Sequence, residues 1–392
     1  MREALIDTQA ITDNVRHLKH LAGVPEFIAV VKADGYGHGA VRAAQAAVRG
    51  GATRIGVADI QEALSLVRAG VCDVPVLAWL HQPEQRFEDA VRAGIEIGVS
   101  SHPQLEAAAT AAGDGSRARV HIKLETGLGR GGASPADWPS LFTRAREHQV
   151  AGRIQVVGLF SHLSGASRHD DLAQVEQFEQ GIDIALLTQL DPPLLHLAAT
   201  AATISLPEAR FNTVRVGIGI YGLSPFSDRS SHDLGLRPAM TLRAPVAAVR
   251  RVQAGQGVSY DYTYRAPKET TLALIPLGYA DGIPRQASGV GRVAINGHSY
   301  RTAGRIAMDQ FVIDIGDNPV EVGDIATIFG DAREGVPSVD DWAAAANTIN
   351  YDILVKIGAR VTRSTSLAKT VVEEIVPTHV ATAPSVTANC SR

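Results

Sequence analysis

Cysteine is almost missing from this chain of 392 residues, which carries only Cys72 and Cys390. Two cysteines cannot build the disulfide framework on which small secreted domains depend, so we expect a reducing compartment, most simply the cytoplasm. Long apolar runs are missing as well, and none approaches the ~20 residues that a membrane-spanning helix needs. The N-terminal stretch MREALIDTQAITDNV mixes charged and apolar side chains, so it predicts no secretory signal.

An excess of charge of either sign is also absent, because 37 Lys and Arg face 41 Asp and Glu for a net charge of −4. Without long basic runs, binding of nucleic acid or of an anionic membrane is not expected as the main role. The hydrophobic fraction of 45% is sufficient for a sizeable core. At ~100–200 residues per domain, the length predicts two or three domains in a soluble protein, most simply an enzyme.

The first 220 residues repeat one pattern, in which a short β-branched run precedes a loop and an alanine-rich helical stretch. Short continuous apolar runs are typical of strands buried on both faces of a parallel sheet. Eight such units predict a (β/α)8 TIM barrel, with an open doubly wound sheet as the alternative. The expected strands are residues 28–31, 54–58, 75–79, 95–99, 119–124, 154–160, 194–198 and 213–217.

The pattern changes after residue 235, where strands joined by Gly, Asn and Asp turns are expected at 240–252, 271–277, 291–295, 311–315 and 325–329. Ser338 and Asp341 predict a capping box before a helix at 342–347. We therefore expect a barrel domain over 1–235 and a mainly β C-terminal domain over 236–370. Residues 371–392 lose periodicity and predict a disordered tail.

Lys32 directly follows the first expected strand, in the segment VVKADGYGHG. Functional groups of a parallel barrel sit where its strands end, and a partly desolvated lysine there can form a Schiff base with a carbonyl. A solvated lysine at the end of the strand is the alternative. The glycines that follow let the backbone approach a ligand closely, and Tyr36 offers a hydroxyl to a phosphate.

VVKADGYGHG resembles the pyridoxal-phosphate attachment motif of the alanine racemases, a family with an N-terminal barrel and a C-terminal β domain. Further motifs extend the resemblance to about Arg363. It implies that Lys32 binds the cofactor pyridoxal 5'-phosphate and that Tyr36 is a phosphate ligand. His38 lies in the same motif, and its role stays open between a partner behind the site and a structural histidine.

The segment VRVGIGIYG at 214–222 is similar to the family's RxGIxxYG motif. The resemblance implies that Arg215 faces the pyridine nitrogen, which should stay unprotonated because a guanidinium does not accept a proton. The N–H groups of Gly217 and Ile218, with the hydroxyl of Thr200, would complete the phosphate site, since barrels often bind phosphate after strands seven and eight.

The segment HIKLETGLGRG at 121–131 resembles the family's KxDTGMGR motif. This implies that Arg130 contacts the cofactor and the substrate, and that Lys123 orients Arg130, in several relatives as a carbamate. Glu125 replaces the commoner aspartate. His162, in the segment GLFSHL, matches a histidine near the cofactor ring.

The segment GVSYDYTY at 257–264 resembles a family motif whose first tyrosine is catalytic, although its three tyrosines could also form an aromatic edge-strand face. The resemblance implies that Tyr260 acts in the partner subunit of a homodimer. The segments LGYADGIPR at 277–285 and GRIAMDQ at 304–310 complete the match. By resemblance, the backbone at Met308 meets the substrate carboxylate, and the entrance is lined by Tyr279, Arg285, Asp309 and Tyr351.

Racemisation explains the pairing of Lys32 with Tyr260, because a planar carbanion must lose a proton on one face and regain one on the other. A phenol with a pKa near 10 needs nearby positive charge to act as a base at neutral pH, and His162 and the arginines are candidates for it. We expect a racemase that interconverts L- and D-alanine with pyridoxal phosphate and without a metal. Family membership implies that the D-alanine supplies peptidoglycan.

Four alternatives are weighed against this hypothesis. A racemase of broader specificity shares the same motifs. A non-catalytic pyridoxal-phosphate carrier would lack the second domain and an equivalent of Tyr260. A decarboxylase on a related scaffold would place a cysteine in its second domain, which neither Cys72 nor Cys390 fits. A Schiff-base aldolase without a cofactor would leave Arg215 and the phosphate site unexplained.

Overall fold

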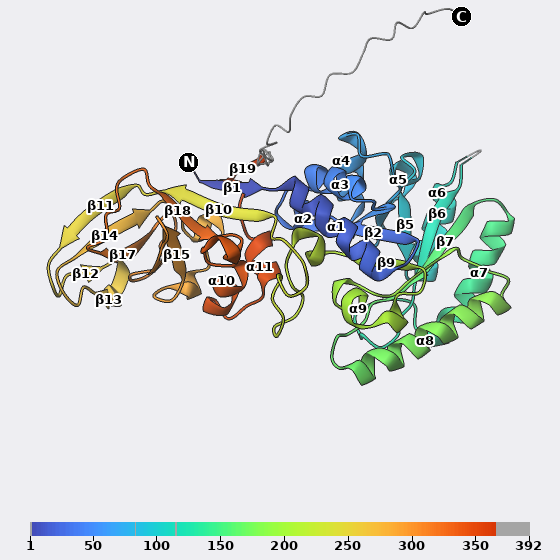
Figure 1. The fold of residues 1–392 in the computed structure, drawn as a ribbon. Helices are drawn as coiled ribbons and strands as arrows, with labels where there is room; N and C mark the ends of the chain where they lie inside the picture. The colour runs from blue at the N-terminus through green and yellow to red at the C-terminus, as the bar shows by residue number, and fades with distance from the viewer. Residues whose placement is uncertain (1, 83, 114–115, 366–392) are drawn as a thin grey trace, which may run out of the picture.

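The computed structural model describes residues 2–82, 84–113 and 116–365. Two bodies lie side by side, a parallel barrel and a mainly β domain, with helices α10 and α11 at their junction (Figure 1). The predicted tail over 371–392 and Cys390 lie outside the described residues. No helix in the described part of the chain is long and apolar enough to cross a membrane.

The first body is a closed barrel of eight parallel strands, in the order in which they occur along the chain. Each strand overlaps one of the eight predicted runs, which confirms the (β/α)8 fold. The barrel closes where Ile28 of the first strand pairs with Arg215 of the last. The strands are β2 (Glu26–Val30), β3 (Arg54–Val57), β4 (Val76–Ala78), β5 (Glu96–Val99), β6 (Ala118–Lys123), β7 (Ile154–Phe160), β8 (Leu194–His196) and β9 (Thr213–Val216).

Helices cover the outside of the barrel, and capping side chains and glycines mark their ends. The Asp59 carboxylate accepts a hydrogen bond from the N–H of Glu62 at the start of α4, and Gly70 follows its end with a φ of +84°. The helices are α1 (Thr8–Ala22), α2 (Lys32–Tyr36), α3 (Ala40–Arg49), α4 (Ile60–Arg68), α5 (Glu88–Arg92), α6 (His102–Ala111), α7 (Trp138–Val150), α8 (Arg168–Leu187) and α9 (Thr200–Ser205), with 3-10 turns η1 (Pro135–Asp137), η2 (Pro207–Ala209) and η3 (Ile218–Tyr221).

The second body is built on a six-stranded sheet in the order β16-β15-β18-β10-β1-β19. Its strands are β1 (Glu3–Ile6), β10 (Met240–Pro245), β15 (Arg292–Ile295), β16 (His298–Arg301), β18 (Ile325–Phe329) and β19 (Thr362–Thr365). Strand β1 comes from the start of the chain and pairs with β10 and β19, so the N-terminus completes this sheet rather than the barrel.

A three-stranded sheet and a hairpin extend the second body at the end away from the barrel (Figure 1). The sheet contains β11 (Ala248–Val252), β14 (Thr270–Ile275) and β17 (Phe311–Gly316), and the hairpin contains β12 (Gly257–Val258) and β13 (Tyr264–Arg265). Short 3-10 turns connect elements of the second body: η4 (Tyr260–Tyr262), η5 (Tyr279–Asp281), η6 (Arg285–Ala287) and η7 (Ala332–Glu334).

The prediction of one continuous strand over 240–252 is wrong. Two strands, β10 and β11, lie there in different sheets, and Pro245 ends the first because it has no N–H to donate to a ladder. The predicted capping box is confirmed: Ser338 and Asp341 bond each other's backbone N–H groups at the start of α10 (Val339–Ala345). Helix α11 (Asn350–Val355) follows it and packs against α2.

Candidate active site

A cavity of about 640 Å³ opens at the C-terminal ends of the barrel strands and continues to α11. Among the residues that line it are ten of those singled out in the sequence: Lys32, Tyr36, Lys123, Arg130, His162, Thr200, Arg215, Gly217, Ile218 and Tyr351. A larger cavity of about 840 Å³ lies between the loop at 223–233 and α10, but no lysine lines it. The barrel cavity is therefore the candidate site for chemistry that needs an amine.

Lys32 follows β2 directly and opens a turn of unusual handedness. The φ angles of Ala33, Asp34, Gly35 and Tyr36 are all between +52° and +63°, so the chain makes a left-handed turn that costs about 1–2 kcal/mol per non-glycine residue. The Glu62 carboxylate holds this turn, because it accepts the N–H of Ala33 at 2.6 Å and the N–H of Ala58 at 2.8 Å. The lysine is thereby presented to the cavity by a braced turn.

The electrostatic surroundings of Lys32 lower the pKa of its amine. Burial lowers the pKa of Lys32, and the positive charges of Arg130 and Arg215 lower it further, while the Glu62 carboxylate opposes the shift. A neutral amine is the form that attacks a carbonyl or takes up a proton. The lowered pKa makes this form easier to reach at Lys32 than at a solvated lysine.

Small and hydroxylic residues converge beside Tyr36. The Thr200 hydroxyl accepts a hydrogen bond from the N–H of Gly217 at 3.1 Å. A Cβ atom on Gly217 would lie 2.4 Å from the Tyr36 hydroxyl, so only glycine leaves room for that hydroxyl. Ile218 begins η3 and therefore has an N–H group without a partner inside that turn. Two hydroxyls and backbone N–H groups suit an anion such as phosphate.

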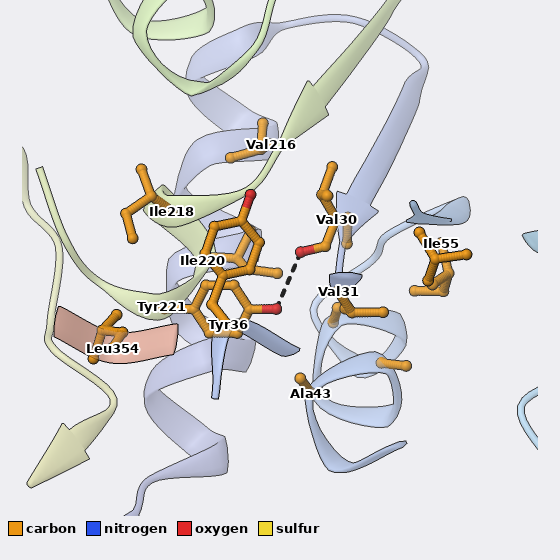
Figure 2. Packing of buried hydrophobic residues seen from close by; sticks show 14 of the residues in the cluster. Val30, Val31, Tyr36, Ala43, Ile55, Val216, Ile218, Ile220, Tyr221 and Leu354 are labelled. Carbon is orange, nitrogen blue, oxygen red and sulfur yellow. Dashed lines mark hydrogen bonds between the residues drawn. The ribbon is translucent and has the colours of Figure 1, made fainter. Parts of the chain in front are cut away.

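Aromatic packing fixes the position of Tyr36 and of the strand before Lys32. The ring of Tyr36 lies 4.9 Å from the ring of Tyr221, between centroids. The Tyr221 hydroxyl donates a hydrogen bond to the carbonyl oxygen of Val30 at 3.0 Å (Figure 2). His38 stacks on Tyr221 and bonds the carbonyl oxygens of Gly35 and Tyr36. His38 is fully buried behind the turn and does not line the cavity.

Arg215 is buried at the base of the cavity and donates mainly to backbone carbonyls. Its guanidinium contacts the carbonyl oxygens of His196 and Ser161, each at 2.6 Å, and the Nδ1 atom of His196 at 3.0 Å. Burial lowers the pKa of Arg215 to about 9, which leaves it protonated at neutral pH. His162 lies 3.3 Å from the same guanidinium, and burial together with this charge lowers the pKa of His162 to about 3.

The loop after β6 carries Arg130 and is organised by Glu125. The Glu125 carboxylate accepts hydrogen bonds from four N–H groups, those of Gly127, Gly129, Arg130 and Gly131, over 2.7–3.3 Å. Burial lowers the pKa of Lys123 at the end of β6, and the charges of Arg130 and Arg215 act in the same direction. Glutamate at position 125 therefore reaches the backbone of the whole loop and fixes its course.

The second domain contributes one predicted residue to this cavity, Tyr351 at the start of α11. Burial raises the pKa of Tyr351 to about 12. The other predicted residues of this domain do not line the cavity: Tyr260, Tyr279, Arg285, Met308 and Asp309. Tyr260 has 68% of its surface exposed, on the hairpin turn that lies far from the barrel in Figure 1.

These outlying residues form a second group of their own. The N–H groups of Tyr279 and Ala280 donate to the carbonyl oxygens of Ala307 and Met308. The Ser259 hydroxyl donates to the carbonyl oxygen of Arg305 at 2.6 Å, which brings the Tyr260 turn to the same strip. We call residues 259–262, 279–281 and 304–309 the tyrosine strip. Arg285 begins η6 and lies outside this strip. The structure therefore divides the predicted site between the barrel cavity and a part of the second domain where Tyr260, Tyr279 and Met308 are exposed.

Several residues that line the cavity were not predicted from the sequence. Trp79 and Phe160 line it from the ends of β4 and β7, and Asp171 lines it from α8. The rule that barrel sites lie at strand ends could have found the first two, because both close expected strands. Asp171 carries no local signal, and its position follows from the packing of α8. No group of His, Cys, Asp or Glu within the described ranges could hold a metal ion.

Two family models match almost the whole chain: "Alanine racemase, N-terminal domain" over residues 6–225 and "Alanine racemase, C-terminal domain" over 239–365. The alanine racemase of Salinispora arenicola is 47% identical over 367 residues, which cover 92% of this chain and 97% of that protein. The crystal structure of alanine racemase from D-cycloserine-producing Streptomyces lavendulae has a TM-score of 0.91 at 44% identity, covering 93% and 97% of the two chains. Alanine racemase of Clostridium difficile 630 has a TM-score of 0.86 at 30% identity, covering 93% and 95%.

Proposed function

The chain belongs to the alanine racemase family, and from this premise we propose that it interconverts L- and D-alanine with pyridoxal 5'-phosphate held in the barrel cavity and with Lys32 and Tyr260 as its two bases. The observation that carries the proposal is a half-buried lysine in the same cavity as hydroxyl and backbone N–H groups that suit a phosphate. Each residue role below is part of this proposal.

The residues of the cavity fit this cofactor. A volume of about 640 Å³ is within the range of ~300–1,000 Å³ that is usual for cofactor sites. The missing Cβ of Gly217 lets the Tyr36 hydroxyl lie close to the Gly217 backbone, so that both would face one phosphate. Lys32 has a lowered pKa, which suits a covalent bond between its amine and the cofactor's aldehyde.

Individual residues would hold the cofactor as follows. Tyr36, Thr200 and the N–H groups of Gly217 and Ile218 would bind the phosphate, and Lys32 the aldehyde carbon. Arg215 would face the ring nitrogen and leave it unprotonated, because a guanidinium has no proton acceptor. When bound, the cofactor supplies a conjugated ring that draws electrons from the Cα–H bond of an attached amino acid.

The two bases would work from opposite faces of the substrate Cα. The Nζ atom of Lys32 would hold or release the proton on one face, and the Oη atom of Tyr260 would do so on the other. Tyr260 is exposed and outside the cavity of its own chain, so it is free to enter the cavity of a second copy. We propose a homodimer in which each Tyr260 completes the partner's site.

The remaining residues would bind and admit the substrate. Arg130, on the loop braced by Glu125, would contact the cofactor and the substrate, and Lys123 would orient Arg130. His162 would lie beside the cofactor ring. The backbone at Met308 would meet the substrate carboxylate in the partner's site. The entrance would be lined by Tyr279, Arg285, Asp309 and Tyr351.

A racemase of broader specificity is the second candidate function. A single methylene in an apolar pocket changes binding by only about 1–3 kcal/mol, so small amino acids are separated weakly.

The D-alanine product would be consumed in making peptidoglycan in the cytoplasm.

The test combines product analysis with location of the cofactor. The purified protein is incubated with each L-amino acid, and D-products are measured on a chiral column; we expect alanine to react fastest. Faster racemisation of serine, lysine or arginine would replace the proposed substrate. Borohydride reduction followed by peptide mass spectrometry should find the cofactor on Lys32, and its absence there would overturn the proposed cofactor site.

A further inference from the structure

A line of four polar side chains crosses the interior of the barrel and ends on Arg215. The Glu96 carboxylate at the start of β5 lies 3.0 Å from Nε2 of His121 on β6. Nδ1 of His121 lies 2.9 Å from Nε2 of His196 on β8, and Nδ1 of His196 lies 3.0 Å from Nη1 of Arg215 on β9. Glu96, His121 and His196 have no exposed surface. We call these four residues the barrel relay.

The charges at the two ends of the relay are opposite. Arg215 is 6% exposed, and among the described residues no acidic side chain forms a salt bridge with it. Buried charges are normally paired, because an isolated one is strongly disfavoured. Hydrogen bonds connect Arg215 to the Glu96 carboxylate through the imidazoles of His196 and His121. Burial alone would raise the pKa of Glu96, but His121, Arg119 and Arg54 together lower it to about 2, so it is ionised.

The two ends also fix where the protons lie. A guanidinium only donates, so Nδ1 of His196 must accept and its proton must be on Nε2. That proton points to Nδ1 of His121, which must accept as well, so His121 carries its proton on Nε2. This second proton points to the Glu96 carboxylate, which only accepts when it is ionised. Working from either end gives the same order of donors and acceptors.

A charged imidazole at either position would break this order. Protonated His121 would donate from Nδ1 to His196, whose remaining proton would then face the Arg215 guanidinium. Burial lowers the pKa of both histidines, which agrees with two neutral rings. Neighbouring residues hold both rings in place. The ring of Phe160 stacks on that of His196, with centroids 4.9 Å apart and an interplanar angle of 1°. A Cβ atom on Gly158 would lie 2.5 Å from Nδ1 of His121, so glycine leaves the room that the His121 ring occupies.

We propose that Glu96 is a positioning residue for Arg215, which acts by fixing His121 and His196 as Nε2–H tautomers so that His196 offers Nδ1 as an acceptor to the guanidinium. The relay accepts a hydrogen bond from Nη1 of Arg215, while the backbone carbonyls of His196 and Ser161 accept from Nη1 and Nη2. This inference rests on the proposed role of Arg215 at the cofactor ring. Glu96 itself lies at the opposite end of the barrel strands and touches no part of the cavity.

The first test reads the tautomers directly and needs neither activity nor cofactor. The protein is labelled with 15N-histidine, sedimented, and measured by magic-angle-spinning NMR at neutral pH. His121→Gln and His196→Gln variants assign the two residues among the 13 histidines. Both residues should show a protonated Nε2 and an unprotonated Nδ1. A protonated Nδ1 on His196, or an imidazolium at either residue, would overturn the proposal.

The second test compares three variants of the holoenzyme. Glu96→Gln keeps an acceptor for His121 but loses the charge, Glu96→Leu loses both, and Arg119→Leu removes an ion-pair partner of Glu96 while leaving the relay intact. We expect kcat to fall about 5-fold in E96Q, about 50-fold in E96L and less than 2-fold in R119L, with KM for alanine within about 2-fold in all three. His196 Nδ1 should become protonated in a fraction of E96L molecules.

The outcomes separate this inference from the proposed function. A wild-type kcat in E96L, or an R119L variant as impaired as E96L, would overturn the positioning role even if racemisation is confirmed. If the protein proves not to racemise alanine, the tautomers of His121 and His196 still decide whether Glu96 orders the relay. Loss of folding in E96L would leave the wild-type NMR spectrum and the E96Q variant to decide it.

Discussion

At the scale of single residues, Tyr260 is the clearest test of the two-base proposal. Tyr260→Phe removes one hydroxyl from an exposed side chain that lies outside the Lys32 cavity. Racemisation should fall by about 10²–10⁴, the usual contribution of a general acid–base group, because one face of Cα loses its proton carrier. The absorbance band of the bound cofactor should stay, and both are measured on the same purified sample.

Tyr262→Phe is the matched control for this variant. Tyr262 lies two residues away, is 57% exposed and also has a hydroxyl that could meet a second copy. Turnover in Y262F should stay close to that of the unmodified protein. Normal turnover in Y260F would end the assignment of Tyr260 as a base.

Gly217 tests the phosphate site at the same scale. Gly217→Ala places a Cβ about 2.4 Å from the Tyr36 hydroxyl, so either the hydroxyl or the backbone must move. We expect the affinity for pyridoxal phosphate to fall about 10-fold or more, since a displaced ligand group loses ~1.4 kcal/mol or more of binding. Titration of the apo-protein with the cofactor, followed by absorbance, measures the change.

Gly113→Ala provides the control, because a Cβ there meets only the Ser116 hydroxyl oxygen at 4.0 Å and Gly113 does not line the cavity. Its cofactor affinity should match that of the unmodified protein. Equal affinities in G217A and G113A would contradict the placement of the phosphate beside Tyr36.

At the scale of elements, the left-handed turn after β2 depends on a side chain from another helix. Glu62→Ala removes the acceptor for the N–H groups of Ala33 and Ala58. A backbone donor that loses its partner costs about 1–3 kcal/mol, and the strained turn has no other brace from α4. We expect a lower Tm and slower formation of the Lys32–cofactor bond.

Glu62→Gln separates the effect of the hydrogen bonds from the effect of the negative charge. Its amide carbonyl can still accept one of the two N–H groups, so Tm should lie between those of E62A and the unmodified protein. Thermal unfolding and stopped-flow absorbance after addition of pyridoxal phosphate measure both effects. An unchanged rate of bond formation in E62A would show that the turn holds its shape without Glu62.

At the scale of the whole molecule, the divided site predicts complementation between inactive chains. Lys32→Ala and Tyr260→Phe should each be inactive as homodimers. In a mixed symmetric dimer one site would carry both mutations and the other neither. Random mixing in equal amounts makes half of the dimers mixed, so activity should recover to about a quarter of the unmodified level.

The assay requires mild dissociation and reassociation of the two variants, with each variant treated alone as the control. Size-exclusion chromatography reports whether dimers form again. Dimers that form without regaining activity would show that Tyr260 does not act in the partner's site.

Buried histidines predict sensitivity of the whole fold to acid. Burial lowers the pKa of His38 to about 4 and, with the charge of Arg215, that of His162 to about 3. Between these values and about 6.5 the unfolded chain binds more protons than the folded one, so the free energy of unfolding falls as the pH falls. The loss is about 1.4 kcal/mol per pH unit for each such histidine.

Urea unfolding at several pH values from 7.5 to 5 measures this slope. His38→Asn keeps a donor near the carbonyl oxygens of Gly35 and Tyr36 but does not titrate, so its slope should be smaller. A slope in H38N equal to that of the unmodified protein would show that His38 takes up no proton on unfolding.

Much of the fold could be predicted because its signals are local. The eight barrel strands are continuous apolar runs, and the capping residues Asp59 and Ser338 mark helix starts by their own side chains. Strands β1 and β19 were not predicted, because each is four residues long and pairs with partners more than two hundred residues away. The break between β10 and β11 was missed because the two residues that join them, Val246 and Ala247, are apolar, and only Pro245 marks the point where the chain changes sheets.

The sequence by itself determined the fold class and the kinds of chemical group in the barrel cavity, because apolar periodicity and the order of motifs are written along the chain. Only the tertiary structure decided how these groups are combined. It braces the Lys32 turn through Glu62, joins Glu96 to Arg215 through two histidines, and leaves Tyr260 outside its own cavity. The physical reason is that contacts between distant segments depend on barrel closure and domain packing, which no local pattern encodes.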